Sequence, residues 1–209
     1  MTKEIHHKKI LVIPSFLTRN YFRRVEKNPN AILFVGRLEV AHKGTDLLIK
    51  ALYYVKDKIP SVKLYIVGEG SSSQYLKELV AEYGLEDNVI FCGYVTEKQL
   101  IEMYSRSELL AMPSHREGMP MVLLEAMSAG LPIVAFDIDC IAEALDGGMY
   151  GILVKKGDVE GLAEQIITLL KNNELRAYYT KKSLERSKKY TQVDVVRSIE
   201  KVYVKLCSS

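Results

Sequence analysis

The chain has 209 residues, of which 48% are hydrophobic and 26% charged, a balance typical of a globular protein that buries a sizeable core. Its formal net charge of +3 at pH 7 is too small to indicate nucleic-acid or membrane binding, and no apolar run approaches the ~18 residues of a membrane-spanning helix. Three widely spaced cysteines without a CxxC pair favour reduced thiols in a cytoplasmic protein over disulfides or a zinc site.

Apolar and amphipathic runs alternate along the chain. In chain order they predict a strand at 9–16, a strand at 31–36, a helix at 45–60, a strand at 62–68, a helix at 72–85, a strand at 88–93, a helix at 97–107, a strand at 108–114, a helix at 121–129, strands at 132–137 and 150–155, and helices at 158–172, 174–189 and 192–207. Thr45 or Asp46 is the expected N-cap of the first helix. Pro120 is expected at the first position of the helix at 121–129, and Gly130 at its C-terminal cap.

This alternation predicts an α/β fold with a doubly wound parallel sheet, because continuously apolar strands need helices on both faces. In such sheets, ligands bind at the carboxyl ends of the strands. The loops expected there are 36–44, 68–72, 93–96, 114–120 and 137–148.

The stretch EGMPMVLLEAMSAG, residues 117–130, places two carboxylates around an otherwise apolar helix. The free N–H groups at the helix start, near Met121 and Val122, favour an anion such as phosphate, and Gly118 lets the backbone approach a ligand. Glu117 and Glu125 then suit the hydroxyls of a sugar and of a ribose. The alternative is a structural Glu125 paired with an arginine and a Glu117 that is only a surface charge.

Other polar residues of these loops carry weaker signals. Arg37 and Lys43 follow the strand at 31–36 and suit a diphosphate, although ordinary solvated surface explains them better when they are taken alone. The sequence Asp-Ile-Asp at 137–139 matches a metal-binding pattern of some sugar transferases, but so short a pattern is frequent by chance. Cys140 has no neighbouring base that would make it a nucleophile.

Several spaced segments together resemble the C-terminal domain of retaining GT-B glycosyltransferases of family 4, the glycosyl transferases group 1. They are ILFVGRLEVAHKGTDLLIKAL, VKLYIVGEG, NVIFCGYV, PSHREGMPMVLLEAMSAGLPIVAFD, which carries the Glu-x7-Glu signature, and EALDGGMYGILVKKGDVEGLAEQI. The resemblance covers roughly residues 30 to 175 and implies a Rossmann-like domain, one half of a GT-B fold. Where the family often has Gly-Gly in the donor loop, this chain has Asp139 and Cys140.

The resemblance implies a role for each matching residue. Arg37 and Lys43 bind the donor diphosphate, Glu117 the sugar hydroxyls, and Glu125 the ribose, so that Arg37, Lys43 and Glu117 are the catalytic set. The full donor-binding set is Gly36, Gly93, Tyr94, Gly118, Met119, Pro120, Met121, Val122 and Glu125. No metal and no cofactor are expected, and the substrate is a UDP-, GDP- or ADP-sugar.

The resemblance also implies a domain plan. Residues 1–30 are expected to be a strand and connection from the interdomain region, and residues 31–190 the nucleotide-sugar-binding domain. Residues 191–209 are expected to form a helix that would pack on an N-terminal acceptor domain, which is expected to be missing from this chain. The isolated chain is then inactive and cytoplasmic. The whole enzyme serves polysaccharide or lipopolysaccharide synthesis and meets a membrane only peripherally. Two alternatives remain open: a sugar-nucleotide epimerase or phosphorylase of the same fold, and a non-catalytic module that binds a partner protein. No nucleic-acid partner is expected.

Overall fold

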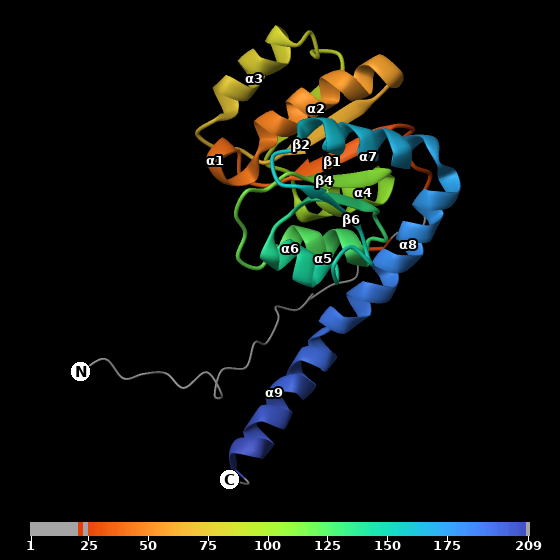
Figure 1. The fold of residues 1–209 in the computed structure, drawn as a ribbon. Coiled ribbons are helices and arrows are strands. Elements are labelled where there is room, and N and C mark those ends of the chain that lie inside the picture. Colours follow the sequence, from red (N-terminus) through yellow and green to blue (C-terminus); the bar gives the residue numbers. More distant parts are fainter. Residues whose placement is uncertain (1–20, 23–24, 208–209) are drawn as a thin grey trace, which may run out of the picture.

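The computed structural model describes residues 21–22 and 25–207, and these residues fold around one six-stranded sheet (Figure 1). Its strands are β1 (Ala31–Val35), β2 (Lys63–Val67), β3 (Val89–Gly93), β4 (Leu109–Met112), β5 (Ile133–Asp137) and β6 (Ile152–Lys155). Their order across the sheet is β3-β2-β1-β4-β5-β6, and every neighbouring pair is parallel. The predicted doubly wound, Rossmann-like fold is confirmed.

The helices cover both faces of this sheet. They are α1 (Val40–Lys43), α2 (Thr45–Lys58), α3 (Ser73–Glu82), α4 (Glu97–Arg106), α5 (Met121–Ser128), α6 (Asp139–Ala144), α7 (Val159–Lys171), α8 (Asn173–Ser187) and α9 (Gln192–Cys207), with a short 3₁₀ turn at Lys188–Tyr190. No helix among the described residues is long and apolar enough to cross a membrane.

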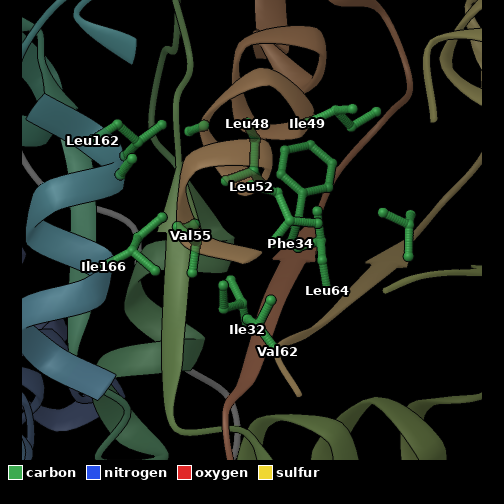
Figure 2. Close-up of a cluster of buried hydrophobic side chains, with 14 of the residues drawn as sticks. Ile32, Phe34, Leu48, Ile49, Leu52, Val55, Val62, Leu64, Leu162 and Ile166 are labelled. Atoms are coloured by element: carbon green, nitrogen blue, oxygen red, sulfur yellow. The ribbon is translucent and has the colours of Figure 1, made fainter. Parts of the chain in front are cut away.

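Two separate apolar cores fill the space between the sheet and its helices. On the α2 face, side chains of α2, α3 and α7 pack onto the strands, as in the cluster of Ile32, Phe34, Leu48, Ile49, Leu52, Val55, Val62, Leu64, Leu162 and Ile166 (Figure 2). On the opposite α5 face, α4, α5 and α6 contribute Tyr104, Leu123 and Ile141, which pack with Leu33 and Leu110 of the sheet. Burial of apolar surface on both faces explains why the strands read as continuous apolar runs.

Most of the predicted elements are present. The six strands predicted between residues 31 and 155 and all seven predicted helices are confirmed, with ends shifted by a few residues. The predicted strand at 9–16 lies outside the described residues. Two short helices were missed, α1 and α6, in the predicted loops 36–44 and 137–148. Segments of four and six residues are too short to show a helical period.

Two predicted helix starts were wrong by one or two positions. Helix α2 begins at Thr45, and its N-cap is Gly44 with a φ of 61°, so neither Thr45 nor Asp46 is the cap. Pro120 is the N-cap of α5 and not its first helical residue. Gly130 follows the C-cap Ala129 with a φ of 70°, which agrees with its predicted role at the helix end.

The last helix projects away from the domain (Figure 1). Helix α8 packs against α5, but along α9 the side chains of Val193, Val196 and Val204 are exposed to solvent. An apolar surface therefore lies open in the described part of α9. The predicted acceptor domain that would cover it stays a prediction.

The strand order also fixes where a ligand crevice lies. From β1 the chain moves to β2 on one side of the sheet, whereas from β4 it moves to β5 on the other side. The loops that leave the carboxyl ends of the neighbouring strands β1 and β4 therefore diverge and open a crevice between them.

Candidate functional site

The loops after β1 and β4 are joined by backbone contacts. The carbonyl oxygen of His42, in α1, accepts hydrogen bonds from the N–H groups of His115 (2.8 Å) and Arg116 (3.3 Å). Gly44 follows with its left-handed φ, and a Cβ at this position would lie 2.1 Å from the carbonyl oxygen of Pro113. Only glycine allows this approach, which places the end of α1 against the loop after β4.

This junction brings Lys43 and Glu117 together. Lys43 Nζ lies 2.6 Å from Oε1 of Glu117, and the two side chains are only 22% and 9% exposed. The hydroxyl of Ser114 donates to the same oxygen at 2.7 Å. The alternative in which Glu117 is a plain surface charge is therefore wrong. Oε2 of Glu117 and the two other N–H groups of the ammonium can still bind a ligand.

Arg37 lies beside this pair. Its guanidinium is 72% exposed and contacts Glu39 at 3.3 Å, a weak surface pair that a ligand can displace. A cleft of about 470 Å³, the first cleft, is lined by Arg37, Glu39, His42, Lys43, Arg116, Glu117 and Gly118. The structure thus brings together all three predicted catalytic residues. Three cationic side chains, Arg37, Lys43 and Arg116, face two carboxylates there, so the first cleft has a net positive charge that suits an anionic ligand.

A second cleft of about 740 Å³ shares Arg37 with the first. It is lined also by Leu38, Gly68, Glu69, Gly70, Ser73, Lys77, Phe91, Gly93 and Tyr94. Gly68 has a φ of 121°, and a Cβ there would lie 2.1 Å from the carbonyl oxygen of Gly36. This close approach holds the turns after β1 and β2 together. The predicted donor-binding residues Gly93 and Tyr94 thus lie in a cleft that adjoins the predicted diphosphate residues.

The predicted backbone segment 118–122 leads from the first cleft into α5. Gly118, Met119 and Met121 are exposed, whereas Pro120 is buried. The N–H groups of Met121 and Val122 are the first two of the helix and have no acceptor within it. The eight residues of α5 direct their positive end toward this edge of the sheet.

Glu125 has partners that sequence reasoning missed. The hydroxyl of Tyr104 donates to Oε2 at 2.9 Å, and that of Tyr21 donates to Oε1 at 3.2 Å. Among the described residues no arginine contacts it, and the two tyrosines are its partners there. The arginines at 19, 23 and 24 lie outside the described residues, so the alternative of an arginine partner stays a prediction. Burial, followed by the charge of Glu125, raises the pKa of Tyr104 well above its ordinary value. Glu125 does not line either cleft, and its predicted contact with a ribose stays a prediction.

Cys140 also touches the site. Its Sγ lies 3.4 Å from the backbone carbonyl oxygen of Glu117. Burial, and secondly the charge of Glu117, raises the pKa of this thiol. A protonated thiol is a poor nucleophile, which agrees with the prediction that Cys140 is not one. Within residues 21–22 and 25–207, no three histidine, cysteine, aspartate or glutamate side chains are grouped to hold a metal ion.

Other site residues gave little signal in the sequence. Ser114 is the first residue of the predicted loop 114–120, and a serine at a strand end is common. Arg116 directly precedes Glu117 in the sequence, and this adjacency was the only sign in the sequence that Arg116 lies in the site. Tyr21 lies 104 residues from Glu125, so only the folded chain reveals their contact.

Comparison with known proteins adds family relationships to this geometry. Residues 19–186 match the family model described as "Glycosyl transferases group 1". A phosphatidyl-myo-inositol mannosyltransferase of Mycobacterium leprae (strain TN) is 32% identical over 179 residues, which are 85% of this chain and 47% of that protein. The chain spans about half the length of this relative.

Two solved structures share the fold. A variant of S. aureus TarM, crystallised in complex with UDP among other ligands, matches with a TM-score of 0.84 and 26% identity, over 92% of this chain and 39% of that one. Anabaena HepE in complex with UDP and glucose matches with a TM-score of 0.73 and 26% identity, over 87% of this chain and 49% of that one.

Proposed function

Because the chain belongs to the glycosyl transferases group 1 family, we propose that it is the donor-binding C-terminal half of a retaining GT-B glycosyltransferase of family 4. The whole enzyme transfers a hexose from a nucleotide sugar to an acceptor hydroxyl. The observation that carries this proposal is the Lys43–Glu117 pair, which lies beside Arg37 at the crevice between β1 and β4. The UDP in the structures of TarM and HepE supports a nucleotide donor.

Lys43 and Glu117 are suited to opposite sides of the bond that breaks. The ammonium of Lys43 keeps two N–H donors for phosphate oxygens, while Oε2 of Glu117 accepts from a sugar hydroxyl. The short contact between them then holds the diphosphate and the sugar next to each other. As the nucleoside diphosphate departs, Lys43, Arg37 and the start of α5 stabilise its growing negative charge.

The nucleobase occupies the neighbouring second cleft in this proposal. The backbone at Gly93 and Tyr94 borders the base, and Glu125 reaches the ribose hydroxyls. No metal takes part, because cationic side chains meet the diphosphate.

The acceptor site lies on a further domain, which α9 contacts through its exposed apolar residues. Residues 31–190 alone therefore bind the donor but transfer little sugar. The setting is cytoplasmic polysaccharide or lipopolysaccharide synthesis.

Calorimetric titration with UDP, GDP and ADP tests the proposal. We expect selective binding of one nucleotide and at least a tenfold loss of affinity in Lys43→Ala. Lys58→Ala is the matched control, because it removes the same charge at the far end of α2, where Lys58 is 61% exposed. If folded protein binds none of the three nucleotides, or if Lys43→Ala binds as the wild type does, the proposal is wrong.

A further inference from the structure

A third hollow lies on the α2 face, away from both clefts. It is a groove of about 1040 Å³ between the second half of α2 and α7, and we call it the tyrosine groove. Its lining residues are Tyr53, Tyr54, Lys56, Asp57, Lys58, Pro60, Tyr83, Glu160, Ala163, Glu164, Ile167, Thr168 and Lys171. None of them lines the first or the second cleft. Figure 1 shows α2 and α7 side by side on this face.

Three tyrosines form an aromatic cluster in the lining of the groove. The ring of Tyr53 packs edge-on against Tyr54, with centroids 5.7 Å apart, and against Tyr83, with centroids 5.5 Å apart. Mutual packing fixes the rings, yet Tyr53 is 51% and Tyr54 45% exposed. Rings that are already ordered lose little conformational entropy when a ligand stacks on them.

The charges around these rings are balanced. Lys56, Lys58 and Lys171 face Asp57, Glu160 and Glu164, which gives three cations against three anions. Two of the lysines are occupied, because Lys56 donates to the carbonyl oxygen of Gly84 at 2.6 Å and Lys58 pairs with Asp57 at 2.7 Å. A lining without net charge offers no overall attraction to a polyanion such as nucleic acid.

The unoccupied polar groups lie on α7. Among the described residues, the carboxylates of Glu160 and Glu164 and the ammonium of Lys171 form no ion pair. They supply acceptors and a donor beside the rings, and the hydroxyl of Thr168 supplies both. The groove thus combines flat apolar faces with a polar rim of both hydrogen-bonding kinds.

We propose that the tyrosine groove is a second carbohydrate-binding site, which holds a neutral oligosaccharide away from the donor site. A pyranose ring has an apolar face of C–H groups, which stacks on a tyrosine ring, and equatorial hydroxyls that both donate and accept. No charged ligand matches this lining as well. The inference rests on the proposed function, since a growing sugar polymer is the ligand that such an enzyme meets, and the groove would keep it near the enzyme between transfers.

Affinity electrophoresis tests this proposal with the whole chain. Native gels are cast with soluble α-glucan, with β-glucan, with mannan, or with heparin as a polyanion. We expect at least one neutral polysaccharide to retard the protein. The double variant Tyr53→Ala/Tyr54→Ala should lose at least tenfold in apparent affinity. Tyr75→Ala should not, because Tyr75 is 47% exposed on α3 and lies outside the groove.

Further measurements separate the groove from the fold and from the donor site. Glu160→Gln/Glu164→Gln keeps all three tyrosines and should weaken retardation several-fold, and the nucleotide affinity of every variant should equal that of the wild type. The proposal is overturned by any of four results: no retardation by a neutral polysaccharide, retardation by heparin alone, an equal loss in Tyr75→Ala, or self-association through Tyr53 and Tyr54 in sedimentation. Loss of nucleotide binding in all proteins would instead contradict the proposed function.

Discussion

Lys43 and Glu117 stand 74 residues apart in the chain, yet their charged atoms lie 2.6 Å from each other at the crevice between β1 and β4. Because both side chains are largely buried, this pair is screened less than an ordinary surface pair. Each charge therefore reduces the field that the other presents to a ligand. Binding of an anion and binding of a hydroxyl-bearing group are coupled through this contact.

Replacement of Glu117 by glutamine tests that coupling. We expect Glu117→Gln to bind free UDP several-fold more tightly than the wild type, because Lys43 loses its opposing charge. About 1.4 kcal/mol corresponds to a tenfold change in affinity. The amide keeps the shape of the side chain and can still accept from Ser114. Calorimetry with UDP and with UDP-glucose measures the effect. The ratio of the affinity for UDP-glucose to the affinity for UDP should be smaller in the variant than in the wild type. Weakening of UDP binding to the level of Lys43→Ala would show that Glu117 does not oppose the anion.

Gly44 supports the same contact through the backbone. Gly44→Ala adds a Cβ at a φ of 61°, 2.1 Å from the carbonyl oxygen of Pro113. Gly84→Ala is the matched control, since Gly84 has the same φ of 61° and no atom within 4 Å of an added Cβ. The control should lower the free energy of unfolding by about 1–2 kcal/mol, and Gly44→Ala by about 1–3 kcal/mol more. Urea denaturation measures both. Equal losses would mean that the loop after β4 moves aside without cost.

Tyr104 gives a prediction that depends on pH. Its side chain is fully buried and donates to Glu125 at 2.9 Å, so Tyr104→Phe should cost about 1.5–3 kcal/mol at pH 8. The folded state raises the pKa of Tyr104 well above 10.0, its ordinary value. Above pH 10 the unfolded chain therefore releases this proton while the folded chain keeps it, and the stabilisation falls as pH rises.

The measurement is urea denaturation of wild type and Tyr104→Phe between pH 8 and pH 11. The difference in unfolding free energy should be constant up to about pH 9.5 and shrink above pH 10. Tyr75→Phe, at an exposed position on α3, controls for general alkaline effects. A difference that stays constant to pH 11 would contradict the predicted shift.

Particular residues show how far sequence reasoning reaches. The strands and long helices follow from periodicity. The loops after parallel strands share one edge of the sheet, so Arg37, Lys43 and Glu117 could be placed at that edge before the strand order was known. Helix α1 could not be predicted, because its four residues carry no period and it is held in place by the loop after β4. The tyrosine partners of Glu125 depend on packing between α4, α5 and residue 21, which no local pattern encodes.

The role of Glu125 can be tested by a ratio of two nucleotide affinities, which does not depend on how stable the variant protein is. If Glu125 binds a ribose, the wild type should prefer UDP over 2′-deoxy-UDP by several-fold, because the lost hydroxyl leaves a charged acceptor without that partner. In Glu125→Gln the amide oxygen still accepts from one tyrosine and the amide N–H group donates to the hydroxyl of the other. The preference for UDP should then shrink toward one. Calorimetry with both nucleotides on both proteins gives this ratio, in which a general loss of folded protein cancels. An unchanged ratio would mean that Glu125 only anchors Tyr21 and Tyr104, and that the ribose binds elsewhere.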